Sequence, residues 1–199
     1  MTPETTVTTG SDRPPAYLGW VVLVTGLGGL LASLVLSVEK YLLLTNPFYA
    51  PSCDLGAAVS CRDVMSSWQG AVLGFPNPYL GLVAFPVVLT LGVLVVGGVT
   101  LPRWCWAGLS LGTVAGFGFV LWLISQSLFV IQAICPYCVV VWVCVSVLLA
   151  HAPRALADAG GGPTARLWGW LDRWWPWVLG VWLVALAVLV VVSASRFGG

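Results

Sequence analysis

The strongest candidate for chemistry in this sequence is a pair of cysteines separated by two residues. Cys135 and Cys138 occur in the string Cys-Pro-Tyr-Cys, at the beginning of a long apolar run. At the amino-terminal end of a helix, residues three apart share one face, and the free backbone N–H groups there favour a thiolate over a thiol. Pro136 suits this position because the first helical turn does not need its missing N–H. The motif therefore predicts a thiol–disulfide redox pair.

A zinc site is the main alternative use of this motif. Zinc requires four protein ligands in a structural site, or three and a water molecule in a catalytic one. The only histidine, His151, is separated from Cys138 by about 20 Å of helix, so it cannot complete a site there. A site with four cysteine ligands stays open, although it would be an unusual use of cysteines that face an oxidising compartment. We therefore expect redox chemistry and no bound metal.

A second pair of cysteines, Cys53 and Cys61, lies in a mixed polar segment that contains Pro, Asp and Arg residues. One interpretation is a structural disulfide that staples this segment. The other is a redox pair that reaches both a soluble partner and the first motif, and passes electrons by thiolate attack through a mixed disulfide. The other two cysteines, Cys105 and Cys144, lie within apolar runs, and we expect them to be buried small apolar residues.

The composition indicates which solvent surrounds these motifs. Charged residues make up 8% of the 199 residues and hydrophobic residues 59%, whereas ordinary soluble domains carry about 25% charged residues. Such a chain must lie in lipid. The net charge is only +1 and there is no basic stripe, so we expect no binding to nucleic acid, which requires clustered positive charge.

The apolar runs predict an all-α membrane protein with five transmembrane helices, because about 20 apolar residues span the hydrocarbon core. The uncharged stretch 104–153 is too long for one span and suits two, so the chain must reverse close to the first motif. Asn77 and Pro78 supply an N-cap and a first helical residue. We expect helices at approximately 17–45, 78–99, 104–131, 136–151 and 175–195.

The segments outside these helices complete the expected organisation. Residues 1–16 are polar and predict a disordered cytoplasmic tail, and residues 17–199 form a single integral-membrane domain. Residues 48–76 predict a structured extramembrane loop that lies on the bundle and carries the second cysteine pair. Glu39 and Lys40, at the end of the first helix, are interpreted as interfacial anchors.

Positive charges indicate the orientation in the membrane. Five spans place the termini on opposite sides, and one side would hold more basic residues than the other: Arg13, Arg103, Arg154, Arg166 and Arg173 against Lys40, Arg62 and Arg196. We therefore expect a plasma-membrane protein with a cytoplasmic amino terminus. Its carboxyl terminus and both cysteine pairs would lie outside, where disulfides persist.

Oxidation of a dithiol within a membrane needs an electron acceptor. The sequence has no Gly-x-Gly-x-x-Gly after a strand, no Cys-x-x-Cys-His and a single histidine, so nothing indicates a nucleotide, a flavin or a haem. A lipid-soluble quinone, menaquinone or ubiquinone, is the natural acceptor. It would bind in an apolar pocket near Cys138.

The ordered set of motifs resembles the vitamin K epoxide reductase family, in its bacterial branch, over approximately residues 17–149. The shared features are a Cys-x7-Cys loop after the first helix, Ser67 within the string 61–67, Asn77 with Gly81 at the start of the second helix, and a Cys-x-x-Cys at the start of the fourth. The resemblance implies four helices bundled around a quinone site, with a fifth helix that is found in bacterial members.

The resemblance also implies an electron path. Cys53 and Cys61 would carry electrons from a thioredoxin-fold protein to Cys135 and Cys138, and Cys138 would be the sulfur nearest the quinone. No thioredoxin-like domain follows the last helix in this sequence. The partner is therefore expected to be a separate, DsbA-like extracytoplasmic protein.

Polar support for the quinone is a further implication. Asn77 would form a hydrogen bond with a quinone oxygen, although capping of its helix is an equally good role and the two can coexist. Ser67 would either support the site or pack the loop. Trp142 and Leu80 stand where vertebrate members carry other aromatic residues, so quinone reduction is expected here and epoxide reduction is not assumed.

Together these features predict a membrane thiol:quinone oxidoreductase that reoxidises a secreted DsbA-like protein and so supports disulfide formation outside the cell. Two other classes of protein stay open. One is a non-enzymatic membrane scaffold whose disulfides are structural. The other is a metal-binding or transport protein that uses the four outer cysteines as ligands.

Overall fold

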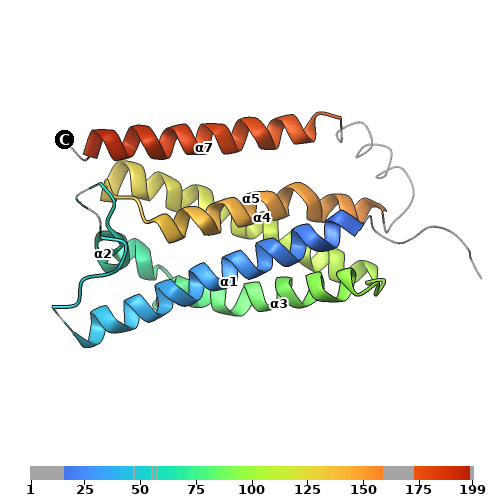
Figure 1. Ribbon diagram of the computed structural model, residues 1–199, viewed down its shortest axis with the longest axis horizontal. Coiled ribbons are helices and arrows are strands. Elements are labelled where there is room, and N and C mark those ends of the chain that lie inside the picture. The colour runs from blue at the N-terminus through green and yellow to red at the C-terminus, as the bar shows by residue number, and fades with distance from the viewer. Residues whose placement is uncertain (1–15, 47, 55, 57, 159–172, 198–199) are drawn as a thin grey trace, which may run out of the picture.

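The computed structural model describes residues 16–46, 48–54, 56, 58–158 and 173–197. It contains five helices that are long and apolar enough to span a membrane. They are α1 (Ala16–Thr45), α3 (Pro78–Val96), α4 (Arg103–Gln126), α5 (Pro136–Asp158) and α7 (Trp175–Phe197). They run alongside one another in alternating directions (Figure 1), so the described part of the chain is the all-α, multi-pass membrane protein that the sequence predicts.

Four of these helices form the bundle that positions the site. α1 packs against α3 and α5, and α5 packs against α4. The core between them contains five large side chains that are at most 5% exposed: Leu18, Val22, Phe85, Trp106 and Leu148. Because lipid is as apolar as these side chains, close van der Waals packing stabilises the bundle more than removal of apolar surface from water does.

Glycines allow α1 and α3 to approach each other closely. A Cβ atom at Gly26 would lie 2.7 Å from the backbone nitrogen of Leu89, and a Cβ atom at Gly92 would lie 2.5 Å from the backbone nitrogen of Leu23. Any side chain at either glycine would push the two helices apart. Small residues at such contacts are typical of membrane helix pairs.

The fifth helix, α7, lies on the outside of the bundle against α5 and α4 (Figure 1). Trp182 donates from its indole nitrogen to the Ser146 hydroxyl on α5 at 2.9 Å, and its ring packs edge-on against Phe117 of α4. Leu186 is buried in a cluster with Val120. The bundle is thus four helices with a fifth attached to one side.

The segment between α1 and α3 is structured, as predicted for residues 48–76. It contains α2 (Cys61–Ser66) and a short 3-10 helix, η1 (Trp68–Ala71). Ser60 caps α2, because its hydroxyl accepts a hydrogen bond from the backbone N–H of Asp63 at 3.1 Å. In Figure 1, α2 lies at the end of the bundle where α1 and α7 finish, opposite the start of α1.

The chain between α4 and α5 reverses where predicted. α4 continues as a π-helical segment, η2 (Ser127–Ile131), which ends at the expected residue. Gln132 then adopts a left-handed conformation with φ 57°, and the chain turns back into α5. Single π-helical turns inside membrane or soluble helices are frequent at functional sites.

Two predicted helix ends are wrong. α3 ends at Val96 and not at residue 99, because Gly97 caps it and Gly98 adopts a left-handed conformation with φ 84°. α7 continues for two residues beyond the predicted end at 195, to Phe197.

α5 is also longer than predicted. It does not end at residue 151 but continues through Pro153 to Asp158. Ala152 and Ala155 are 0% and 2% exposed and belong to the bundle core. These tertiary contacts hold a turn that a proline, which lacks an N–H, would weaken in isolation.

Some sequence predictions fall outside the described residues. The tail of residues 1–16 lies outside them except for Ala16, which begins α1, and the basic residues Arg13 and Arg166 also lie outside them.

Candidate active site

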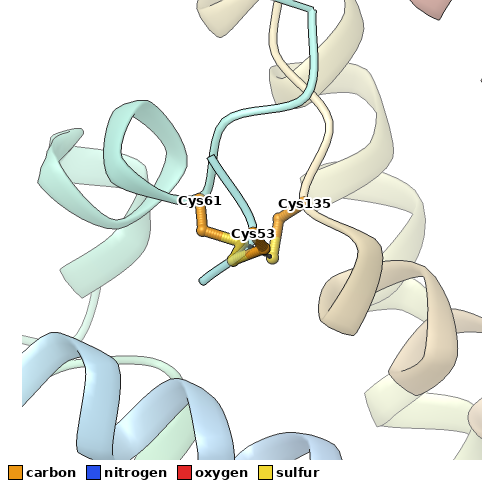
Figure 2. A group of neighbouring side chains, drawn as sticks. All are labelled: Cys53, Cys61 and Cys135. Carbon is orange, nitrogen blue, oxygen red and sulfur yellow. Dashed lines mark hydrogen bonds between the residues drawn. A yellow bond between two sulfur atoms is a disulfide. The ribbon is translucent and has the colours of Figure 1, made fainter. Parts of the chain in front are cut away.

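Three cysteine sulfurs meet where the loop lies against the start of α5 (Figure 2). Cys53 and Cys61 form a disulfide, and the Sγ atom of Cys135 lies 3.1 Å from the Sγ atom of Cys61. All three Sγ atoms are within 4.8 Å of one another. The side chains are buried, with exposed fractions of 5%, 0% and 0%. A free cysteine is therefore placed directly against a disulfide, away from bulk water.

Backbone contacts and core packing hold the two segments together. Cys61 is the first residue of α2, and Cys135 immediately precedes α5. Between them, the backbone N–H of Ile134 donates to the carbonyl oxygen of Ala58 at 3.0 Å. Leu36 of α1 packs in the same cluster as the three cysteines. The loop, α1 and the start of α5 thus position the sulfurs jointly.

The start of α5 favours the thiolate form of Cys135. A hydrogen bond from the Cys138 thiol lowers the pKa of Cys135, and hydrogen bonds from the backbone N–H groups of Cys138 and Tyr137 act in the same direction. Burial and the negative charge of Asp54 raise this pKa, but they do not outweigh the hydrogen bonds. Because the thiolate is the form that attacks a disulfide, charge and geometry both favour exchange between Cys135 and the loop pair.

The same cluster bears on the metal alternative. Within the described residues, Cys53, Cys61 and Cys135 form a group whose sulfurs are close enough to share a metal ion. Two of these sulfurs are bonded to each other, so only Cys135 can offer a thiolate in this state, whereas zinc requires at least three protein ligands. The arrangement suits disulfide exchange better than metal coordination.

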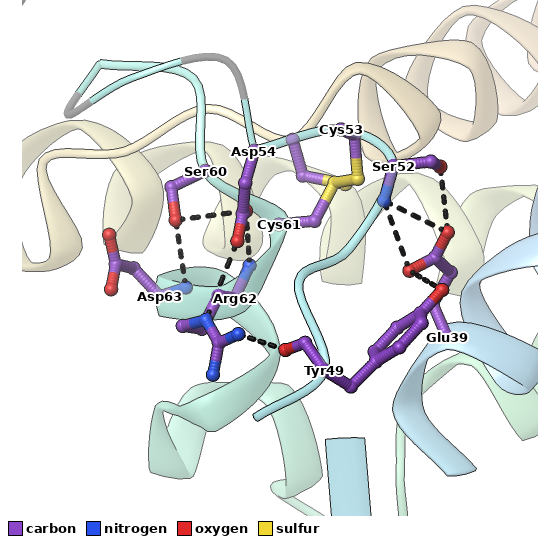
Figure 3. The surroundings of a disulfide bond; sticks show 10 residues. Glu39, Tyr49, Ser52, Cys53, Asp54, Ser60, Cys61, Arg62 and Asp63 are labelled. Atoms are coloured by element: carbon purple, nitrogen blue, oxygen red, sulfur yellow. Dashed lines mark hydrogen bonds and ion pairs between the residues drawn. A yellow bond between two sulfur atoms is a disulfide. The ribbon is translucent and has the colours of Figure 1, made fainter. Parts of the chain in front are cut away.

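A polar network holds the loop on one side of the disulfide (Figure 3). The Asp54 carboxylate accepts hydrogen bonds from the Arg62 backbone N–H at 3.0 Å and from the Ser60 hydroxyl at 3.3 Å. It also pairs with the Arg62 guanidinium at 3.5 Å, and that guanidinium donates to the backbone carbonyl of Tyr49. Residues next to Cys53 and Cys61 are therefore tied to each other across the disulfide.

On the other side, Glu39 of α1 anchors the loop (Figure 3). Its carboxylate accepts from the Ser52 hydroxyl at 2.7 Å, from the Ser52 backbone N–H at 3.2 Å and from the Tyr49 hydroxyl at 3.0 Å. Loss of solvation, together with the hydrogen bond to Glu39 and its negative charge, raises the pKa of Tyr49. The interpretation of Glu39 as an interfacial anchor is wrong, because this side chain is 5% exposed and faces the loop.

Cys138 lines a cavity of about 660 Å³ that α1, α3, α4, α5 and η1 surround. This volume is typical of small-molecule sites, which are mostly apolar with a few polar groups. α3 and α4 have little direct contact with each other, and both contribute to the wall. Trp142, one turn beyond Cys138, is also on the wall. The Cys-x-x-Cys pair thus extends from the sulfur cluster to the cavity.

Asn77 lies on the cavity wall at the start of α3. Its side chain does not cap the helix, so the expected capping hydrogen bond is absent. Instead its amide nitrogen donates to the backbone carbonyl of Gln69 at 2.7 Å. Its amide oxygen is buried without a hydrogen-bond partner in the described part of the chain. An unpaired buried acceptor is costly, and a hydroxyl group of a ligand in the cavity would satisfy it.

Ser67 does not border the cavity. Its hydroxyl donates to the carbonyl of Val64 at 2.8 Å, at the end of α2, which fits the loop-packing role. Gln69 stands closer to the site, because it is 2% exposed, borders the cavity and donates to the Gln126 side chain of α4 at 3.3 Å. Sequence reasoning missed Gln69, since a glutamine in a loop carries no distinctive signal.

Lys40 also differs from its prediction as an interfacial anchor. Its ammonium group donates to the backbone carbonyl of Met65 at 2.6 Å, and its side chain borders the cavity. The signal that could have identified it is its place near the carboxyl-terminal end of an apolar run, where ionisable residues are often functional.

The two remaining cysteines are only partly as expected. Cys144 is buried among the core residues of the bundle, as predicted. Cys105 is half-buried on the cavity wall and not in the core.

A comparison with known protein families supplies an independent assignment. The model of the vitamin K epoxide reductase family matches residues 20–152, well over half of the chain. The matched range includes the loop disulfide, Asn77 and the Cys-x-x-Cys pair. It ends before α7.

Proposed function

This chain belongs to the vitamin K epoxide reductase family, whose members are membrane thiol–disulfide oxidoreductases, and we propose that it reoxidises a secreted thioredoxin-fold protein of the DsbA type and passes the electrons to a membrane quinone. The observation that carries this proposal is the distance of 3.1 Å between the Sγ atoms of Cys61 and Cys135. A disulfide with a purely structural role has no need of a free thiol against it, which argues against the scaffold alternative.

The proposed path is a series of thiol–disulfide exchanges. A thiolate of the reduced partner first attacks Cys53, which forms a mixed disulfide and frees the Cys61 thiolate. The Cys61 thiolate then attacks Cys135 in a Cys135–Cys138 disulfide and releases the Cys138 thiolate. The second thiol of the partner attacks the mixed disulfide, which releases the oxidised partner and the Cys53 thiolate. Finally Cys53 attacks Cys61, which restores the loop disulfide and leaves the Cys-x-x-Cys pair reduced. That final distribution of disulfides is the one in the structure.

The last step regenerates the Cys135–Cys138 disulfide. Two electrons leave the two sulfurs and reduce the quinone, which takes up two protons. The cavity next to Cys138 supports this step, because it is apolar, suitably large and carries the unpaired amide oxygen of Asn77. A quinol hydroxyl could donate to that oxygen.

The location of the site supports the proposed orientation. The sulfur cluster lies where α2 begins, at Cys61, and where Cys135 precedes α5; α2 lies at the end of the bundle opposite the start of α1 (Figure 1). If the amino terminus is cytoplasmic, as the positive charges predict, the sulfur cluster faces the extracytoplasmic side of the plasma membrane. A secreted partner could then reach it.

Replacement of Cys138 by serine tests the function. We expect the Cys138→Ser protein to lose reduction of menaquinone and ubiquinone by a reduced DsbA-like protein. Undiminished turnover would contradict the proposal. Tightly bound zinc at one equivalent, with no quinone reduction by the unaltered protein, would favour the metal-binding alternative.

Removal of Cys61 tests the entry point of the electrons. In the Cys61→Ser protein, Cys53 has lost its disulfide partner and should retain a thioredoxin-fold protein as a stable mixed disulfide. If Cys53 never appears in such adducts, the loop disulfide is structural.

A further inference from the structure

Among the residues that the structure describes, Lys40 is the one charged residue on the wall of the cavity. It is also the only lysine in the chain. Its ammonium nitrogen donates to the carbonyl of Met65, and Met65 packs in the same cluster as Cys61 and Cys135. The positive charge therefore lies at the sulfur end of the cavity, the end that Cys138 also borders.

The ammonium group keeps hydrogen-bonding capacity for a ligand. It has three donors, and Met65 accepts one of them. No carboxylate in the described residues pairs with it: Glu39 binds Ser52 and Tyr49, and Asp54 forms the ion pair. An ionisable residue within a membrane span is costly to keep charged, and such residues commonly mark functional sites.

The proposed quinone reduction needs a proton that the cysteine pair does not supply. The last exchange step releases Cys135 as a thiolate, and the hydrogen bond from the Cys138 thiol favours that form. In this form the pair carries a single proton, on the Cys138 sulfur. Reduction of a quinone to a quinol takes up two.

We propose that Lys40 donates the second proton to the quinone oxygen. This inference rests on the proposed function, and it assigns a catalytic group that the cysteine pair lacks. The Cys135 thiolate and the Cys138 thiol form a disulfide and give up two electrons and one proton. The Lys40 ammonium gives up the other proton and becomes a neutral amine. The products are the disulfide and the quinol, and water at the membrane surface reprotonates Lys40.

Two substitutions separate proton donation from simpler roles. In Lys40→Ala both the charge and the proton are lost, whereas Lys40→Arg keeps the charge and the hydrogen bond but does not release a proton at neutral pH. Both variants should reduce menaquinone about a hundredfold more slowly than the unaltered protein, because general acid catalysis typically contributes 10²–10⁴-fold. Arg196→Gln is the matched control, since it removes a positive charge in the last turn of α7, at the same end of the bundle as α2 (Figure 1) but outside the cavity wall.

Two readouts are independent of quinone turnover. Exchange between the loop pair and Cys135–Cys138 should keep its normal rate in Lys40→Ala, because that step needs no second proton. Labelling with ¹³Cε-lysine gives a single side-chain resonance, and saturating menaquinone should shift it in the Cys138→Ser protein, which cannot turn over. Added ethylamine should partly restore quinone reduction to Lys40→Ala.

Several results would overturn the inference. Full activity of Lys40→Arg would show that charge alone matters. Equal slowing of exchange and quinone reduction in Lys40→Ala would show a structural role through Met65. An unchanged lysine resonance with quinone bound would place Lys40 away from the ligand. Failure of the unaltered protein to reduce any quinone is a different outcome, because it would overturn the proposed function itself.

Discussion

Glu39 connects α1 to the loop that carries the Cys53–Cys61 disulfide, and its replacement by glutamine should release that loop. The carboxylate is 5% exposed and accepts hydrogen bonds from Ser52, the residue that precedes Cys53. Glutamine has nearly the same shape but only one acceptor oxygen and no charge. The change therefore removes charge-assisted hydrogen bonds while it leaves the packing intact.

The expected magnitude follows from these contacts. The Ser52 hydroxyl and backbone N–H donate to the carboxylate at 2.7 and 3.2 Å, and a hydrogen bond to a charged group contributes about 1.5–3 kcal/mol. A loss of about 2 kcal/mol would raise the fraction of molecules with an open loop roughly thirtyfold.

Alkylation of Cys61 measures the open fraction. In protein reduced with dithiothreitol, Cys61 is a free thiol, and because it is 0% exposed it reacts with iodoacetamide only when the loop opens. Mass spectrometry of the Cys61 peptide should show a roughly thirtyfold faster reaction in Glu39→Gln. The half-buried Cys105, in the same digest, should react at an unchanged rate, which excludes global unfolding.

Asp63→Asn is the matched control for this experiment. Asp63 is an exposed carboxylate in the same loop, so its loss should leave the reaction rate of Cys61 nearly unchanged. If Glu39→Gln labels Cys61 no faster than Asp63→Asn does, the hydrogen bonds of Glu39 do not hold the loop and the reasoning is refuted.

Two further predictions concern the pH dependence and the packing. The thiol of Cys138 lowers the pKa of Cys135, so attack by Cys135 on a small-molecule disulfide should persist to lower pH than attack by an ordinary thiol. The rate should fall off only as the pH drops through that lowered pKa. Cys138→Ala should move the pH profile to higher pH, and an unmoved profile would contradict the hydrogen bond between the two cysteines. A Cβ at Gly92 would lie 2.5 Å from the backbone of Leu23, so Gly92→Ala should destabilise the protein by about 1–3 kcal/mol and lower its thermal midpoint in detergent. The control Gly118→Ala, where a Cβ meets nothing within 4 Å, should leave the midpoint unchanged. Equal midpoints for the two variants would show that α1 and α3 are free to separate.

The helices and the cysteine motifs could be predicted from the sequence because both are local signals. An uncharged run of sufficient length predicts a span, and the spacing of Cys135 and Cys138 predicts a pair at a helix start. The end of α5 could not be predicted in this way. Pro153 favours termination, and only the burial of Ala152 and Ala155 against other helices overrides that preference.

The roles of Glu39 and Lys40 show where local patterns stop being informative. The two residues are adjacent, at the end of an apolar run, and look alike as membrane-surface charges. Consecutive helical residues point about 100° apart, so Glu39 faces the loop and Lys40 faces the cavity. The neighbour that each of these two side chains meets depends on how the helices and the loop pack together. For the same reason, the sequence could not show that Cys61, and not Cys53, lies 3.1 Å from Cys135.

A double variant tests this contact most directly. In Cys53→Ser, Cys138→Ser protein, Cys61 and Cys135 have both lost their usual partners. Mild oxidation followed by non-reducing peptide mapping should identify a Cys61–Cys135 disulfide as the main intramolecular link. If both cysteines remain free thiols after oxidation, the loop and the Cys-x-x-Cys pair do not exchange, and the proposed electron path is contradicted.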